Sequence, residues 1–127
     1  MTIAYWCVLV AIFLPYAFTV YAKFHGDFGP KQNHNPREFL GRLTGARQRA
    51  NWAHQNSLEV LPGFAAAVII AQLVGVAQQA TLDAIAVAFV VSRVIYGLCY
   101  ILDWASLRSL VWFFGMGCIA ALFIVSA

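Results

Sequence analysis

The chain of 127 residues is too apolar for an ordinary water-soluble domain. Residues of the AVILMFWYC set make up 62% of it and charged residues only 10%, whereas soluble domains carry about 45–50% and about 25%. A domain of this length cannot bury so much apolar surface in water. The composition excludes a soluble domain, a disordered chain and a nucleic-acid-binding module, and it indicates an integral membrane protein.

Four long stretches are almost free of charge. Positions 1–22, 60–82 and 109–127 hold no charged side chain, and positions 84–102 hold only Arg93. Each stretch is about as long as a helix that crosses a hydrocarbon core, roughly 20 residues. The chain is therefore predicted to be all-α, a single membrane domain over 1–127 that forms a four-helix bundle. We expect helices at about 2–22, 46–76, 83–103 and 107–126, with a loop at about 23–45.

The first apolar stretch has to be distinguished from a cleavable signal peptide. Such a peptide begins with basic residues and has a shorter apolar core. Here no Lys or Arg precedes the apolar run, which leads directly to a basic cluster beginning at Lys23. We therefore expect a retained membrane helix.

The basic residues predict how the helices are oriented. Six of the eight Lys and Arg residues lie between Lys23 and Arg49, the turn at 77–83 holds none, and the last turn holds Arg108. Basic loops remain on the cytoplasmic side of a membrane. We therefore expect the loop at 23–45 to be cytoplasmic and both termini to lie outside. The net charge of +3 acts as a topology signal, with attraction to anionic lipid as a secondary consequence.

A polar stripe runs along the first half of the second helix. Arg49, Asn56 and Glu59 follow the spacing of one helix face, and no strong helix breaker precedes Pro62. The helix is therefore expected to run without interruption from the cytoplasm into the membrane.

The third helix carries a matching stripe, in which Arg93, Tyr96 and Tyr100 fall on one side. A cation at the centre of a bilayer costs at least about 2.5–3.5 kcal/mol on insertion scales, so Arg93 should face protein or water and have a partner. We predict an ion pair between Arg93 and Glu59, with Asn56 and Tyr96 adding hydrogen bonds. Such a pair either fixes the register of the helices or takes part in ligand binding, and the residues alone leave both readings open.

Cysteine and histidine give no indication of a metal site. The three cysteines all fall in apolar stretches and show no ligand spacing, and the three histidines are scattered. No metal is therefore expected, and His54 is interpreted as a hydrogen-bonding residue between helices.

These stripes resemble sequence motifs of the MAPEG family, membrane-associated proteins in eicosanoid and glutathione metabolism. The first motif is Asn56-x-x-Glu59-x-x-Pro62-x-Phe64, and the second is Arg93-x-x-Tyr96-x-x-x-Tyr100 followed by Leu107-Arg108-Ser109. The motifs cover about half of the chain, and the four-helix layout covers all of it. The chain looks most like a poorly defined bacterial branch of the family, which implies the bacterial inner membrane as its location.

The resemblance implies a homotrimer that binds glutathione as a cosubstrate at the subunit interface. It implies a glutathione S-transferase or peroxidase that acts on lipophilic small molecules by stabilising the thiolate. Catalytic roles then fall on Arg108 and Tyr100. The residues implied to bind glutathione are Arg49, Asn56, Glu59, Arg93 and Tyr96.

The chain departs from the characterised enzymes at one binding position and in the spacing from Tyr100 to Arg108. Those enzymes usually carry Arg four positions before the Asn of the second helix, where this chain has Trp52. Arg49 lies one turn before Trp52, and it could take the place of the usual Arg only if its side chain extended toward the position of Trp52. Both departures support a second hypothesis, in which a non-catalytic protein of the same fold binds another anionic or lipidic ligand or a partner. A third reading, a small transporter or channel subunit, rests on the charges of Glu59 and Arg93 inside apolar spans.

Overall fold

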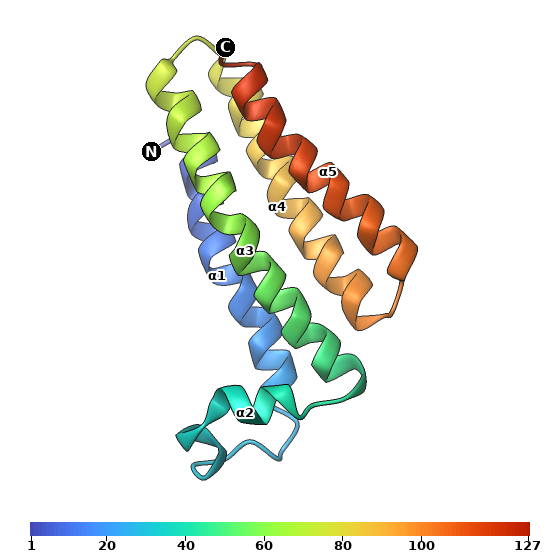
Figure 1. Ribbon diagram of the computed structural model, residues 1–127. Helices are drawn as coiled ribbons and strands as arrows, with labels where there is room; N and C mark the ends of the chain where they lie inside the picture. The colour runs from blue at the N-terminus through green and yellow to red at the C-terminus, as the bar shows by residue number, and fades with distance from the viewer.

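The computed structural model describes all 127 residues, and it contains helices but no strands. Four long helices, α1 (Ile3–Lys23), α3 (Gly45–Val74), α4 (Gln79–Ile101) and α5 (Ala105–Ile124), lie side by side (Figure 1). All four are long and apolar enough to cross a membrane. The predicted all-α, four-helix membrane architecture is therefore confirmed.

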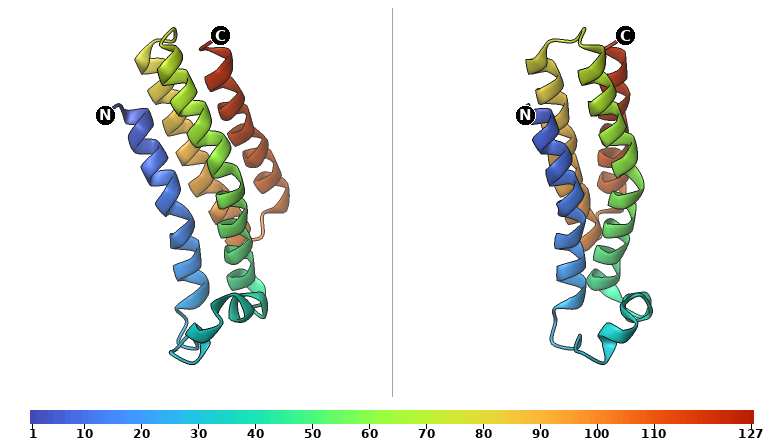
Figure 2. Two further views of the ribbon diagram at one scale, coloured as in Figure 1. Left: turned by 60° about the vertical axis from the view of Figure 1, so that its left-hand side comes forward. Right: turned by 90° about the vertical axis from the view of Figure 1, so that its left-hand side faces the viewer.

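The helices pack most closely as two pairs, α1 with α3 and α4 with α5. Helix α4 contacts both helices of the first pair, and α1 and α5 lie on opposite sides of the bundle (Figure 2). Small side chains at the contacts let the backbones approach closely, as is common in membrane bundles. The core combines alanines with larger apolar side chains around two stacked rings, Phe64 and Phe89, whose centroids lie 3.9 Å apart.

The helix ends differ from the expected positions by a few residues. Helix α3 ends at Val74 because Gly75 takes a left-handed conformation, with φ at 70°, and caps it. Helix α4 begins at Gln79, about four residues before the expected start. There the Gln79 side chain donates to the Asp83 carboxylate over 2.8 Å, which stabilises an additional polar turn. At the same end of the bundle, Asp83 accepts a 2.8 Å bond from the backbone of Ala4 in α1.

The segment between α1 and α3 is folded rather than a plain loop. It contains a 3₁₀ turn (Gln32–His34) and a short helix α2 (Pro36–Gly41), which lies crosswise at the end of the bundle opposite both termini (Figures 1 and 2). We call this the loop end. Asn35 caps α2 by accepting from the Glu38 backbone over 3.3 Å, and Pro36 occupies its first turn.

One ion pair ties this segment to the bundle. The guanidinium of Arg47 donates to both carboxylate oxygens of Asp27 over 2.8 and 2.7 Å, and its Nε donates to the Ala22 carbonyl over 2.8 Å. These hydrogen bonds lower the pKa of the Asp27 carboxyl below its ordinary value, because they favour the charged form.

Candidate functional site

Arg93 lies buried between α4 and α3, with 4% of its surface exposed. Its Nη2 donates to Asn56 Oδ1 over 3.0 Å and to Ser57 Oγ over 3.2 Å. The guanidinium also lies over the Tyr96 ring, 4.0 Å from its centroid, which adds a cation–π contact. Its buried Nε has no hydrogen-bond partner, so one donor of a membrane-embedded cation is left for a further acceptor.

The predicted direct ion pair between Arg93 and Glu59 is wrong. The only two salt bridges of the structure lie at the loop end, between Arg42 and Glu38 and between Arg47 and Asp27. Asn56 stands between the two groups instead. Its Oδ1 faces the guanidinium, and its Nδ2 donates to Glu59 Oε2 over 3.1 Å.

The position of Asn56 between Arg93 and Glu59 has a simple geometric reason. Asn56 lies level with Arg93, whereas Glu59 is nearly one helical turn further along α3. Glu59 is exposed on the surface of the bundle, whereas Arg93 is buried within it. An amide presents an acceptor and a donor at once, so Asn56 satisfies the cation and the carboxylate together.

Nearer the loop end, two tyrosines connect Arg93 to Arg108. The rings of Tyr96 and Tyr100 meet edge to face with centroids 5.2 Å apart. The Arg108 guanidinium lies over the Tyr100 ring, 4.4 Å from its centroid, and it forms no salt bridge. A cavity of about 310 Å³ opens here, lined by Tyr96, Tyr100, Arg108, Ser109, Trp112 and Phe113.

Arg49 reaches the same region from the start of α3, where it caps α4. Its Nε donates to the Tyr100 carbonyl over 2.8 Å, and its Nη2 donates to the Ile101 carbonyl over 3.0 Å. A cation at a helix C-terminus satisfies carbonyls that have no partner within the helix. Trp52, one turn along α3, approaches Tyr100 with ring centroids 6.4 Å apart.

The structure thus joins all seven residues singled out from the sequence into one set of contacts. Helices α3 and α4 carry six of the residues, and the start of α5 carries Arg108. The connected residues are Arg49, Asn56, Glu59, Arg93, Tyr96, Tyr100 and Arg108.

Sequence reasoning missed Ser57, Trp112 and Phe113. Ser57 is 5% exposed and accepts from the buried guanidinium. Its signal was a small polar residue directly beside Asn56 in a helix that enters the membrane. Trp112 and Phe113 carried no signal of their own, because aromatic residues are common throughout the apolar stretches.

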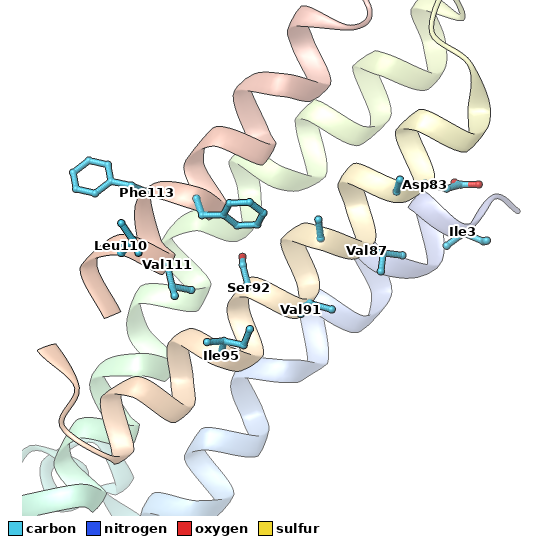
Figure 3. Close-up of a pocket in the computed structure, with 12 residues that line it drawn as sticks. Ile3, Asp83, Val87, Val91, Ser92, Ile95, Leu110, Val111 and Phe113 are labelled. Atoms are coloured by element: carbon cyan, nitrogen blue, oxygen red, sulfur yellow. The ribbon is translucent and has the colours of Figure 1, made fainter. Parts of the chain in front are cut away.

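A larger apolar groove lies beside this site, between α4 and α5 (Figure 3). Its volume is about 1110 Å³, and ten of its twelve lining residues are hydrophobic. Phe113 lines both this groove and the smaller cavity that contains Arg108, so the two are neighbours. Asp83 and Ile3 lie at the other end, and Ser92 lies between the two helices (Figure 3).

Other candidate groups have structural surroundings. His54 Nδ1 lies 2.9 Å from the Pro15 carbonyl oxygen of α1, which agrees with its interpretation as a hydrogen-bonding residue between helices. Cys7, Cys99 and Cys118 are buried, free thiols. No three His, Cys, Asp or Glu side chains lie close enough together to hold a metal ion.

The structure has four helices that are long and apolar enough to cross a membrane, and hydrogen-bonded polar side chains lead from its interior to its surface. These features define an integral membrane protein of the four-helix type. The sequence model of the MAPEG family matches residues 3–127, essentially the whole chain. The chain therefore belongs to the MAPEG family. No curated protein and no solved structure matches it.

Proposed function

We propose that the protein is a glutathione-dependent transferase or peroxidase that acts on lipophilic electrophiles. One observation carries the proposal. Hydrogen bonds connect buried Arg93 through Asn56 to the exposed carboxylate of Glu59. Ring contacts through Tyr96 and Tyr100 connect Arg93 to Arg108, a cation without a salt bridge.

The donor set suits the chemistry of glutathione, which has two carboxylates, one ammonium group and one thiol. The guanidinium of Arg108 lines the cavity and forms no salt bridge, so it is a donor for an anionic group, whereas buried Arg93 holds the Asn56 amide that faces Glu59. The Glu59 carboxylate is available to accept hydrogen bonds from the ammonium group, because its partner in the structure is the Asn56 amide rather than a cation.

Arg108 is the residue that would act on the sulfur. When bound, glutathione would supply a thiol whose anion is the nucleophile. A guanidinium nearby favours that anion over the neutral thiol and so lowers its pKa. Tyr100 holds the Arg108 guanidinium over its ring, and we assign it the role of positioning this cation and contacting the sulfur.

The apolar groove suits the second substrate. It is lined almost wholly by aliphatic and aromatic side chains, and it adjoins the cavity that contains Arg108. A lipophilic molecule dissolved in the bilayer can enter such a groove along the seam of α4 and α5. It would then meet the nucleophile at the end nearest Phe113.

The exposure of Glu59 supports assembly as a homotrimer. A carboxylate on the outer face of an apolar helix is costly against lipid, and Glu59 is exposed on a single protomer. Neighbouring copies would cover this face of α3 and complete the site at the subunit boundary. For the membrane, we propose the bacterial inner membrane, with the loop end in the cytoplasm and both termini outside.

The test is glutathione binding and turnover by the purified protein. We expect millimolar glutathione to raise the melting temperature, and we expect conjugation of a reactive aryl halide. Arg108→Ala should abolish conjugation while leaving the fold intact, and Arg37→Ala, an exposed cation in α2, is the matched control. The proposal is refuted if the wild-type protein shows no stabilisation by glutathione and no conjugation.

Trp52 supports a second candidate, a non-catalytic MAPEG-fold protein that binds another anionic or lipidic ligand or a partner. This residue stands where characterised enzymes of the family carry an Arg, and Arg49 is engaged with the end of α4 instead. Glutathione would then cause no stabilisation, whereas another carboxylate-bearing ligand would. Turnover that is lost specifically in Arg108→Ala would exclude this candidate.

A further inference from the structure

A second polar cavity lies at the loop end, apart from the site of Arg93 and Arg108. It is a groove of about 330 Å³ formed by the segment around α2. All but one of its lining residues are polar: Lys31, Gln32, His34, Asn35, Glu38, Phe39 and Arg42.

The charges around this groove leave an excess of cationic donors. Its one carboxylate, Glu38, is held by Arg42 and by the Asn35 side chain, whose Nδ2 donates to it over 2.8 Å. Lys31 has no acidic partner. The Arg42 side chain is 78% exposed, so its guanidinium has further donors to offer. Together with the His34 imidazole, the groove presents three donor groups suited to an anion.

The groove also sits where a membrane surface would lie. Helix α2 lies crosswise at the ends of α1 and α3, where the apolar spans stop (Figure 1). Beside it, three phenylalanines meet edge to face. The ring of Phe28 is 6.2 Å from that of Phe24 and 5.2 Å from that of Phe39. Phe24 is 67% exposed, so an aromatic edge accompanies the polar groove, as expected of an interfacial element.

Contacts within the chain hold the segment in this shape. Arg47 binds Asp27 with two hydrogen bonds, and its guanidinium lies 5.7 Å from the centroid of Phe39. Lys23 Nζ lies over the Phe28 ring at 4.7 Å. These contacts occupy Asp27, so Glu38 is the only acid of the segment that faces the groove's cations.

We propose that this groove binds the phosphate headgroup of an anionic glycerophospholipid from the leaflet at the loop end. Lys31, Arg42 and His34 donate to the phosphate oxygens, and the exposed ring of Phe24 enters the apolar zone beside the acyl chains. A lipid is favoured over a soluble anion because the groove lies at the end of the bundle where the apolar spans stop and has the exposed ring of Phe24 near it. This site is independent of the proposed enzymatic function.

The test compares two variants that remove the same charge. Lys31→Gln changes a lining residue, whereas Arg37→Gln changes an exposed cation of α2 that does not line the groove. Delipidated protein in an uncharged detergent is titrated with phosphatidylglycerol, phosphatidylcholine or inorganic phosphate, and bound lipid is counted by native mass spectrometry. Melting temperatures are measured in parallel, and Lys31→Arg serves as the conservative variant.

We expect phosphatidylglycerol to bind in preference to phosphatidylcholine and to raise the melting temperature. Lys31→Gln should weaken phosphatidylglycerol binding about fivefold, as expected for one cation at a membrane surface, while Arg37→Gln leaves it unchanged and Lys31→Arg restores it. Equal losses in Lys31→Gln and Arg37→Gln would mean diffuse surface attraction and would overturn the proposal. Equal stabilisation by inorganic phosphate, or no preference for the anionic lipid, would also overturn it.

Discussion

The buried Arg93 allows a prediction in which deleting a partner is more harmful than deleting the charge. Asn56→Leu keeps the volume of the side chain but removes the acceptor that lies 3.0 Å from Nη2. Arg93→Met removes the cation itself and leaves an apolar side chain packed against Tyr96. The double variant tests whether the two groups act together.

The expected magnitudes follow from the contacts. A hydrogen bond to a charged group is worth about 1.5–3 kcal/mol, and loss of one partner leaves the other unsatisfied. Arg93 is only 4% exposed and would keep a single bond, to Ser57 Oγ at 3.2 Å. Asn56→Leu should therefore lower the free energy of unfolding by about 2–3 kcal/mol. Arg93→Met should cost about 1 kcal/mol, because the penalty of a buried cation disappears with the cation.

The assay is equilibrium unfolding in mixed micelles, monitored as the loss of the helical circular dichroism signal. The double variant should be no less stable than Asn56→Leu, since without the cation the missing acceptor no longer matters. Ser57→Ala, which removes the weaker acceptor, should fall between wild type and Asn56→Leu. A larger loss in Arg93→Met than in Asn56→Leu, or losses that simply add in the double variant, would refute the reasoning.

Three further predictions concern packing, a cap and pH. Gly97→Ala should cost about 1–3 kcal/mol in unfolding free energy, because a Cβ there would overlap the Phe18 ring; Gly117→Ala, which meets no atom within 4 Å, is the control, and equal stabilities would contradict the close packing. Asp83→Ala removes the acceptor for the first turn of α1, so hydrogen exchange there should accelerate about fivefold, and unchanged exchange would show that the cap contributes nothing. The lowered pKa of Asp27 means that its stabilising effect is present above the ordinary carboxyl pKa and is lost as pH falls through the lower, folded-state value. The melting temperature of wild type should therefore exceed that of Asp27→Asn at pH 6, and the difference should shrink only as pH falls below about 4 toward the lowered folded-state pKa. A difference that stays constant throughout this acid range would disprove the linkage.

The helices could be predicted because charge alone marks them. Arg93 is the only charged residue within 84–102, and no other feature of that stretch interrupts an apolar helix. The stripe containing Tyr96 and Tyr100 followed from helical spacing, and the structure places Tyr96 beside Arg93 and Tyr100 beside Arg108. Periodicity is a local property, so it survives in the folded chain.

The partners of these residues could not be predicted as well. Whether Arg93 meets Glu59 or Asn56 depends on how far α3 is displaced along α4, and that offset is set by packing across the whole bundle. The same offset places Arg49 at the last carbonyls of α4. Helix α2, by contrast, had a local signal, because Asn35 before Pro36 is a typical helix start.

We propose that the cavity lined by Arg108 and Tyr100 binds glutathione and favours its thiolate. The most direct measurement is the ultraviolet difference absorbance of the thiolate when glutathione is titrated into the purified protein at pH 7. We expect a saturable thiolate signal in wild type at this pH, which lies below the pKa of about 8.5 for a free thiol, and we expect loss of that signal in Arg108→Ala. Saturating glutathione that produces no thiolate signal in the wild-type protein would contradict the proposal.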